Sequence, residues 1–410
     1  MTLNQPRNEE TLDSIFSKAL KGRTLFKNHK ALQSDFVPDH LPFRTNQLSS
    51  IAQVLAPILH SSKPSNLLIY GKTGTGKTAA TRHIITKLAD TALTNKNTQS
   101  KFVYCNARMS GTEYRTLADL ATGIGLKIPF TGLAVTEVLS RMQAFMKTNS
   151  LKTVFVLDEI DYLVRSSGDD LLYDLTSSSD KISPGFLSLI GISNDLQFKE
   201  ELGARVQSRL SEEEIVFPPY SAEELRTILN ERASLALNPK AYMTAAINLC
   251  AALSGSEHGD ARRAVDLLRI AGEIAEREGS DQLDERHVRI ALQKIDQDRI
   301  SEALRTLPIH AKIVLLASIH GSSSQKDTAH SSSGCVYEKY CELCEKTGLD
   351  ALTTRRVSGL LTELDTLGLV TAAVVNYGRY GRTKKITSQV SMEVASKVFQ
   401  QDEIIRNLIP

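Results

Sequence analysis

The chain has 410 residues, enough for about three domains at roughly 100 to 200 residues each, so a single core does not hold it all. Its hydrophobic content of 41% and charged content of 23% are those of a globular protein, and a formal net charge of +2 does not by itself indicate nucleic acid. No apolar run approaches the ~18 residues that span a bilayer. Residues 1–7 are polar and lack the apolar core of a signal peptide, so we expect a cytoplasmic protein.

The five cysteines are an odd number scattered along the chain, which argues against a secreted disulfide framework. Cys341 and Cys344 form a C-x-x-C, with Cys335 nearby. A metal site would need a second pair or two histidines, and only His330 is close. We therefore interpret the pair as two cysteines on successive turns of a helix.

The N-terminal region has two parts. Residues 1–30 are polar and basic, and we expect them to form a flexible, loosely packed arm. In the next segment, Pro38 and Pro42 break any helix and impose an extended path. Such a segment can form one wall of a base-binding pocket or a linker at a domain edge, and the local sequence favours neither.

The central motif is residues 71–78, which spell G-x-x-x-x-G-K-[ST] between a short apolar run and a helix-compatible segment. Its glycines let the backbone curl, so that several N–H groups and the start of the next helix point at one phosphate chain. Lys77 adds a charge at the β- and γ-phosphates, and the Thr78 hydroxyl can ligate Mg²⁺. The alternative, a plain glycine-rich turn, leaves the Lys-Thr pair in register unexplained.

Residues 101–106 predict a second strand, and residues 112–125 and 135–148 have helical periodicity. The intervening residues 126–132 contain proline and glycine and cannot continue a helix. We expect a loop there, with an exposed basic and apolar tip that includes Lys127.

The apolar run 153–157 is typical of a central parallel strand buried on both faces. It is followed by Asp158 and Glu159, which it delivers to the sheet edge where open α/β sheets bind ligands. Asp158 can hold Mg²⁺ through water, and Glu159 can polarise an attacking water. An apolar run ending in Asp-Glu is common, but its position about 80 residues after the phosphate motif makes it specific.

A further strand is predicted at residues 187–192. Asn194 follows it and can position water or sense the γ-phosphate, or it can simply form a turn. Arg205 and Arg209 lie four residues apart on one side of a helix. Either can enter a neighbouring subunit's nucleotide site, or both can belong to a solvated surface.

From residue 221 to about 295 the pattern is helical only. Ser221 and Glu224 predict a capping box, and Pro239 predicts the first turn of another helix. Residues 259–266 begin a third helix, and Arg262 near its start faces the neighbouring domain if this lid folds over a nucleotide. The stripe of this helix that we expect to be buried is Ala264, Leu267, Leu268 and Ala271.

The stretch after about residue 305 forms a separate unit. Three predicted helices followed by a β-hairpin make a winged helix-turn-helix. The helices are expected at 308–319, 335–347 and 353–367, and the strands at 370–375 and 383–390.

The hairpin is basic and aromatic and lacks acidic residues, which suits insertion into a minor groove or a grip on phosphates. Arg355 and Arg356 lie early in the third helix, where recognition helices present side chains to the major groove. The alternative is a winged helix used for protein contact. The candidate DNA contacts in the hairpin are Tyr377, Gly378, Arg379, Tyr380, Arg382 and Lys384.

Together these segments resemble a known family. Residues 71–78, 157–161, 192–194, 205–210 and 259–262 are similar to Walker A, Walker B, sensor 1, the arginine-finger box and sensor 2 of AAA+ ATPases. The C-terminal unit adds Leu307-Pro308-x-His310-x-Lys312, Val336-Tyr337-x-x-Tyr340 and Gly378-Arg379-Tyr380-Gly381-Arg382. The combination resembles the archaeal replication initiators related to the eukaryotic origin-recognition complex and the cell-division-cycle loader, from about Phe36 to the end.

The resemblance implies an α/β P-loop AAA+ domain with a parallel sheet and flanking helices, an α-helical lid and a C-terminal winged-helix domain. We place the flexible arm at 1–30, the AAA+ base domain at 31–217, the lid at 218–300 and the winged helix at 301–410. This chain departs from the family pattern after Arg44. The family commonly has acidic residues after the corresponding arginine, whereas this chain has Thr45 and Asn46.

The resemblance also implies residue roles, with ATP or ADP and Mg²⁺ as cofactors. Thr78 and Asp158 would organise Mg²⁺, Glu159 would be the catalytic carboxylate, and Asn194 and Arg262 would be sensors 1 and 2. For the arginine finger we favour Arg209 over Arg205, from its place in a Ser-Arg pair. The nucleotide contacts are then Val37, Pro38, Leu41, Gly74, Thr75, Gly76, Lys77, Thr78, Asp158, Tyr220 and Arg262.

The implied function is an ATP-dependent initiator that binds origin duplex DNA through the winged helix and through the 126–132 loop, where the family inserts its initiator-specific motif. It would act with paralogous subunits at the nucleoid, help to recruit the replicative helicase, and turn over ATP slowly as a switch. One alternative is a signalling NTPase whose winged helix never meets DNA. A clamp-loader-like motor is another, but it would lack the winged helix.

Overall fold

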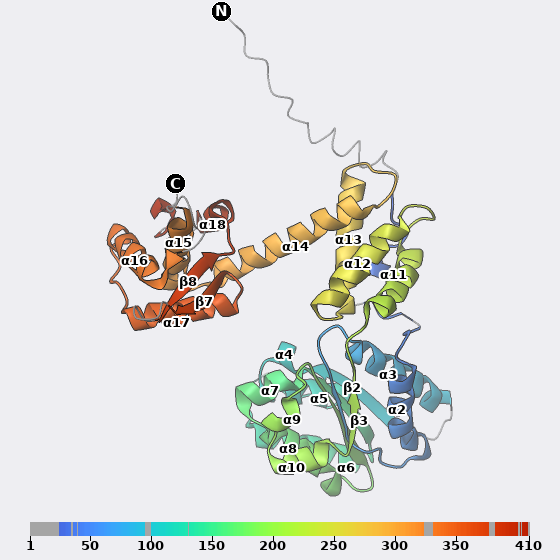
Figure 1. Cartoon of the computed structure of the whole chain (residues 1–410). Helices are drawn as coiled ribbons and strands as arrows, with labels where there is room; N and C mark the ends of the chain where they lie inside the picture. Colours follow the sequence, from blue (N-terminus) through green and yellow to red (C-terminus); the bar gives the residue numbers. More distant parts are fainter. Residues whose placement is uncertain are drawn as a thin grey trace, which may run out of the picture. The chain divides into compact units, whose positions relative to one another are not determined.

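The protein divides into two compact units, Met1–Val288 and Arg289–Pro410, which are described separately. The computed structural model describes residues 24–33, 36–38, 40–94, 100–129, 131–323, 331–376, 382–400, 402 and 404–408. Figure 1 shows the elements along the chain. Helix α14 (Glu285–Thr306) runs from the first unit into the second, and the boundary that we place at 300/301 falls within it.

A five-stranded parallel sheet forms the centre of the first unit, in the order β2-β3-β4-β1-β5. The polar residues that follow the strands lie together at the carboxyl edge of the sheet. The register places the strand ends side by side there, since Asp158 pairs with Ile192 and Tyr70 pairs with Ser193. The four strands that the sequence predicts, β1 to β4, are confirmed, whereas β5 was not predicted. Their bounds are β1 Leu67–Tyr70, β2 Ser100–Asn106, β3 Lys152–Asp158, β4 Phe186–Ser193 and β5 Glu213–Val216.

Helices cover both faces of this sheet (Figure 1). The central strand β3 alternates its side chains, so that Val154 and Val156 belong to one core and Phe155 and Leu157 to the other. The first core contains α2 (Thr45–Leu55), η2 (Ala56–His60) and α3 (Lys77–Thr94). On the other side lie α4 Ala107–Ser110, α5 Glu113–Ile124, α6 Val135–Thr148, α7 Ile160–Ser167, α8 Asp170–Ser177, η3 Ser178–Lys181, α9 Phe198–Glu201 and α10 Ala204–Leu210.

The predicted lid contains α11 (Ala222–Ala236), α12 (Thr244–Glu257) and α13 (Ala261–Arg277). Ser221 and Glu224 form the capping box that the sequence predicts, and the predicted stripe of α13 is buried. The prediction for Pro239 is wrong. The chain turns after Leu237 and α12 begins only at Thr244, because Leu237 forms a backbone bridge with Phe26.

The prediction of a loose arm up to residue 30 is also wrong for its described part. Leu25 and Phe26 are 3% and 5% exposed, and the Leu25 amide donates to the Glu276 carboxylate at 3.0 Å. The short helix η1 (His29–Leu32) then packs on α11 and α13. Apolar burial therefore fixes this segment to the lid despite its basic composition. Residues 1–23 lie outside the described part of the chain.

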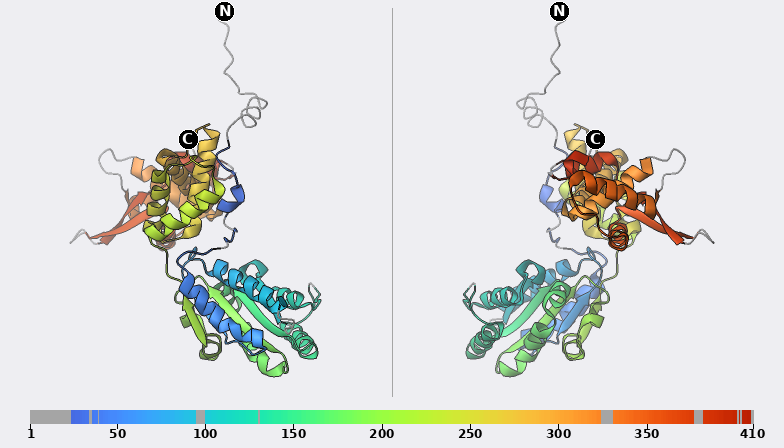
Figure 2. Two further views of the ribbon diagram at one scale, coloured as in Figure 1. Left: turned by 90° about the vertical axis from the view of Figure 1, so that its right-hand side faces the viewer. Right: turned by 90° about the vertical axis from the view of Figure 1, so that its left-hand side faces the viewer.

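The second unit is a winged helix, as predicted. Its helices α15 (Ile309–Ser323), α16 (Ser333–Thr347) and α17 (Thr354–Thr366) enclose one core. The antiparallel strands β7 (Val370–Asn376) and β8 (Arg382–Ser388) extend from them (Figure 2). The sequence did not predict β6 Ser331–Ser332, α18 Met392–Phe399, η5 Arg406–Leu408 or the length of α14.

Cys341 and Cys344 lie on a helix, as the sequence predicts. Cys341 and Cys344 lie one turn apart on α16, and Cys344 is buried in the core of the second unit. Within the described residues there is no group of three or more His, Cys, Asp or Glu side chains that could hold a metal ion. His330 lies outside that part of the chain.

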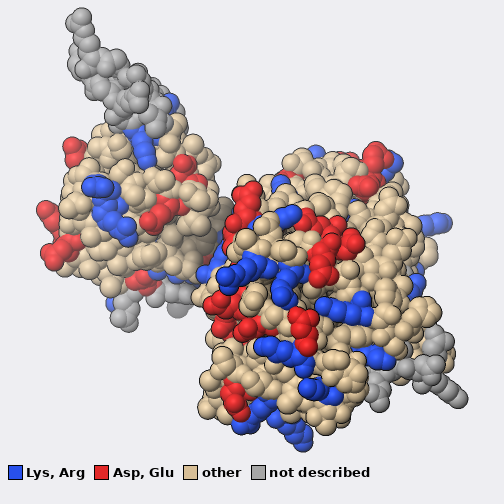
Figure 3. Space-filling view, turned by 90° about the horizontal axis from the view of Figure 1, so that it is seen from below, with Lys and Arg blue, Asp and Glu red and all other residues tan. Residues whose placement is uncertain are grey.

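The charges of the surface are mixed. On the face shown in Figure 3, basic and acidic side chains are interspersed, which agrees with the small net charge. None of the helices that the structure describes is long and apolar enough to cross a membrane.

Candidate nucleotide site and nucleic-acid interface

A cavity of about 380 Å³ lies in the first unit, at the carboxyl edge of the sheet. This volume falls in the range of small-molecule sites. Its walls come from the proline-containing segment, the phosphate loop, the ends of β2, β3 and β4, and the lid helices α11 and α13. The predicted residues that line it are Val37, Pro38, Leu41, Gly74, Thr75, Gly76, Lys77, Thr78, Asp158, Glu159, Asn194, Tyr220 and Arg262.

The phosphate loop has the conformation that its glycines predict. Gly74 and Gly76 have φ values of +68° and +94°, which side chains with a Cβ disfavour. The Lys77 ammonium donates to the Gly71 and Lys72 carbonyl oxygens, each at 2.7 Å, so it lies folded against the loop. Burial lowers the pKa of Lys77 to about 8, and the charge of Asp158 opposes that shift. A bound polyphosphate would stabilise the charged form.

The second cluster joins α3 to the end of β3. Thr78 and Tyr104 both donate hydroxyl hydrogen bonds to the Asp158 Oδ2 atom, each at 2.7 Å, and the Glu159 amide donates to Oδ1 at 2.9 Å. The pKa of Tyr104 is raised by burial and by the adjacent Asp158 charge. Mg²⁺ prefers hard oxygen ligands, and the Thr78 hydroxyl and the Asp158 carboxylate supply them side by side. These residues fit the metal that the sequence predicts.

Glu159 lies beside this cluster in a left-handed backbone conformation, with φ of +55°. Its carboxylate accepts a hydrogen bond from the Asn106 side chain at 3.4 Å and lies 3.6 Å from the Arg108 guanidinium. Asn194 is placed at the end of β4 by its backbone amide, which donates to the Asp161 carboxylate at 3.2 Å. Both predicted side chains therefore line the same cavity as the phosphate loop.

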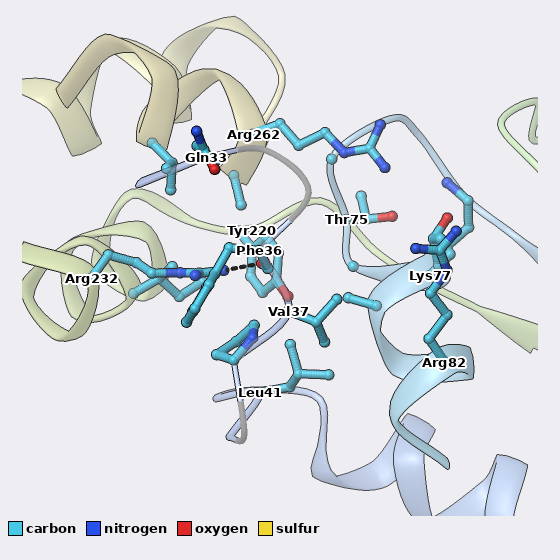
Figure 4. Close-up of a pocket in the computed structure, with 18 of the residues that line it drawn as sticks. Gln33, Phe36, Val37, Leu41, Thr75, Lys77, Arg82, Tyr220, Arg232 and Arg262 are labelled. Atoms are coloured by element: carbon cyan, nitrogen blue, oxygen red, sulfur yellow. Dashed lines mark hydrogen bonds between the residues drawn. The ribbon is translucent and has the colours of Figure 1, made fainter. Parts of the chain in front are cut away.

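The opposite end of the cavity is apolar. Val37 and Leu41 converge there with the ring of Tyr220 (Figure 4). Arg232 of α11 holds this wall in place, because its guanidinium donates to the Phe36 carbonyl at 3.0 Å and lies 4.7 Å from the centre of the Phe36 ring. The apolar side chains at this end of the cavity suit contact with a purine ring.

The start of α13 meets the phosphate loop. The Ala261 amide donates to the Gly74 carbonyl at 3.1 Å, and the Thr73 hydroxyl donates to the Asp260 carboxylate at 3.2 Å. A Cβ on Gly74 would collide with that carboxylate. Asp260 also caps α13, so the lid helix begins directly at the loop. Arg262, the second residue of this helix, points toward Thr75 and Lys77 (Figure 4).

The two arginines of α10 do not line the cavity. Arg205 is exposed, whereas Arg209 is half-buried, lies 3.9 Å from the Asp180 carboxylate and stacks 5.6 Å from the Tyr173 ring centre.

The loop that contains Lys127 connects α5 to α6. Lys127 is exposed, whereas Leu126 and Ile128 pack against the core, so the apolar part of the predicted tip is anchored. The Tyr114 hydroxyl donates to the Pro129 carbonyl at 2.6 Å and fixes the path of the loop. Phe130 lies outside the described residues.

In the winged helix, Arg355 and Arg356 are exposed on the first turn of α17, as predicted. Lys384 of β8 donates to the Thr362 hydroxyl at 2.9 Å and so lies beside that helix. Strand β8 begins at Arg382, which pairs with Asn376 in the ladder. Tyr377, Gly378, Arg379, Tyr380 and the side chain of Arg382 lie outside the described part of the chain.

Comparisons with protein families assign all three parts of the chain. Residues 60–198 match an AAA domain, residues 226–293 match the Cdc6 AAA+ ATPase-type lid domain, and residues 302–398 match the CDC6 C-terminal winged helix domain. The fold and the cavity thus define an AAA+ ATPase-type protein with a lid and a winged helix.

Whole-chain relatives agree with this class. The ORC1-type DNA replication protein 1 of Sulfurisphaera tokodaii is 45% identical over 96% of this chain and 97% of its own length. The corresponding protein of Thermococcus kodakarensis is 43% identical over 98% and 97%. A solved structure of Aeropyrum pernix ORC1 in complex with DNA is 43% identical, with a TM-score of 0.80 over 93% of this chain and 98% of that one. The chain belongs to the family of ORC1-type DNA replication proteins, which confirms the predicted family and fold class.

Sequence reasoning missed four residues that shape the site: Arg44, Tyr104, Arg232 and Asp260. Tyr104 carries a local signal, because it lies two residues before the end of a strand adjacent to the one that delivers Asp158. Asp260 lies beside the predicted sensor arginine and is a preferred helix cap. Arg44 stands out in the sequence only by its place in the family pattern, and Arg232 carries no signal, since their partners are 174 and 196 residues away in the chain.

Proposed function

We propose that this protein is an ATP-dependent replication initiator that binds duplex DNA at replication origins. One observation carries the proposal: the phosphate loop, the Asp158 and Glu159 pair and the start of lid helix α13 all line the same cavity. A nucleotide in this cavity would contact both base domain and lid, so its phosphate state would change how they are held. The archaeal relatives named ORC1-type DNA replication proteins support the assignment.

In this proposal the phosphate loop and the Lys77 charge bind the polyphosphate, and Val37, Pro38 and Leu41 contact the adenine. Release from the Gly71 and Lys72 carbonyls would free the Lys77 ammonium for the phosphates. Mg²⁺, when bound, would neutralise charge that develops on the β- and γ-phosphate oxygens. Thr78 and Asp158 are the residues placed to hold it.

Hydrolysis would use Glu159 to orient and deprotonate the attacking water. In the structure this carboxylate accepts a hydrogen bond from Asn106 and lies near Arg108, so its negative charge is partly engaged by these two side chains. That arrangement favours slow turnover, as expected of an ATP/ADP switch. Asn194 and Arg262 would sense the γ-phosphate, and Arg209 would act on a neighbouring subunit.

DNA binding would combine two surfaces. The exposed arginines at the start of α17 would enter the major groove while the hairpin residues grip phosphates or the minor groove. Lys127 would add a contact from the α5–α6 loop. The DNA complex of Aeropyrum pernix ORC1 supports a DNA-binding role. Partners would be paralogous initiator subunits and the replicative helicase.

The test is the binding of origin-fragment duplexes by an Arg379→Ala/Arg382→Ala variant across a salt series. Loss of two phosphate contacts should weaken binding and lower the salt slope by about 2. Arg141→Ala, on an exposed arginine of α6, is the matched control and should leave both unchanged. Unchanged affinity and slope in the hairpin variant would remove the wing from the DNA interface. A native protein that ignores duplex of every sequence would favour the signalling NTPase instead.

A further inference from the structure

Arg44 is a buried arginine to which neither the sequence analysis nor the proposed function assigns a role. It is only 2% exposed and is the largest of the fully buried side chains. Its hydrogen bonds go to main-chain oxygens, and burial lowers the pKa of its guanidinium, a shift that the charge of Glu224 opposes. A charge in this position is costly unless each donor finds a partner. Its contacts therefore indicate what the fold uses it for.

The Arg44 guanidinium joins three segments of the first unit. Its Nε donates to the Thr75 carbonyl of the phosphate loop at 2.9 Å, and one Nη donates to the Pro218 carbonyl at 2.6 Å. The guanidinium carbon also lies over the Tyr220 ring, 3.8 Å from its centre, and 5.6 Å from the centre of the Phe217 ring. Residues 217–220 are the connection from strand β5 to lid helix α11.

The Thr75 carbonyl belongs to the same rigid peptide plane as the Gly76 amide. That amide is one of the phosphate-loop donors that point toward a bound phosphate. Reorientation of the amide toward phosphate necessarily moves the carbonyl on which Arg44 donates. Gly76 is also close to the connection itself, since a Cβ placed there would lie 3.0 Å from the Tyr220 hydroxyl.

We propose that Arg44 is a positioning residue that transmits phosphate occupancy of the loop to the 217–220 connection, and through it to the lid. The inference rests on the proposed nucleotide site and adds to it the mechanical link between that site and the lid. Lysine cannot replace this link, because a point charge cannot donate from two edges while stacking on a ring. The hydrogen-bond acceptors of Arg44 in the loop and in the connection are main-chain oxygens, so their positions change with the backbone.

The experiment measures hydrogen exchange of the full-length protein with and without ADP. In the native protein, ADP should slow exchange in the phosphate loop and in residues 217–224. Arg44→Gln should bind ADP at least about tenfold more weakly, since a charged donor to two carbonyls is lost. At saturating ADP it should protect the loop but not residues 217–224. Arg44→Lys should recover less than half of that protection.

Arg226→Gln is the matched control, because Arg226 lies on α11 but is exposed and pairs only with its neighbour Glu223. It should behave as the native protein does. A folded Arg44→Gln protein with native ADP affinity, or with native protection of residues 217–224 at saturating ADP, would overturn the inference. If Arg44→Gln does not fold, Tyr220→Leu tests the same link by removing the ring under the guanidinium. Because Tyr220 also lines the nucleotide cavity, only the protection of residues 217–224 at saturating ADP is scored for this variant, and native protection there would overturn the inference. Absence of ADP binding by the native protein would instead refute the proposed nucleotide site.

Discussion

The buried ammonium of Lys77 predicts a specific pH dependence of nucleotide binding. Lys77 is 4% exposed, and its pKa in the empty site is lowered to about 8. A bound polyphosphate restores the charged form, so binding above pH 8 requires uptake of a proton. From pH 7 to pH 9 the protonated fraction of the empty site falls about tenfold. ADP affinity should therefore weaken about tenfold over that interval, or about 1.4 kcal/mol.

The assay is equilibrium titration with a fluorescent ADP analogue at fixed ionic strength from pH 6.5 to 9.5. Lys77→Arg is the control, since a guanidinium does not titrate there, and its weaker binding should be flat with pH. Tyr104 does not interfere, because burial and Asp158 raise the pKa of its hydroxyl well above this range. Native affinity that is constant from pH 7 to 9 would refute the burial argument.

The lowered pKa of Lys77 also affects folding stability. ADP binding should weaken as the pH rises, whereas the stability of the ligand-free protein should increase. The unfolded chain binds a proton at Lys77 up to about pH 10.5, whereas the empty folded site loses it near pH 8. The unfolded state thus binds more protons between these values, so the stability of the ligand-free protein should rise with pH across that window. This contribution is at most about 3 kcal/mol. Urea unfolding with saturating ADP should not show it, because the ligand keeps the ammonium charged.

Three further substitutions test other parts of the structure. Glu159→Gln should lower the rate of phosphate release at least ~100-fold while leaving ADP affinity within about twofold, because the amide cannot accept the water's proton. Tyr104→Phe removes a hydrogen bond to Asp158 and should weaken Mg²⁺ binding about tenfold in a titration of the nucleotide complex, with unchanged binding as the contradicting result. Phe26→Ala should lower the free energy of unfolding by about 3 kcal/mol in urea, whereas a loose N-terminal arm would give no change.

Much of the architecture was predictable because its signals are local. The G-x-x-x-x-G-K-[ST] motif, the apolar run before Asp158 and the capping box at Ser221 each depend on neighbours within a few residues. The failures came from long-range packing. Residues 24–30 look like an arm by composition, yet Leu25 and Phe26 are buried against the lid. Pro239 resembles a helix start, but a bridge to the N-terminal segment turns the chain there.

The sequence by itself determined the class of protein, the order of its domains and the residues that meet at the carboxyl edge of the sheet, because strand ends and turn chemistry are encoded locally. Only the tertiary structure decided what holds those residues in place. Arg44 reaches Pro218 across 174 positions, and Thr73 reaches Asp260 across 187. Contacts of this kind leave no periodic or compositional trace, since nothing in either segment depends on the other until the chain has folded.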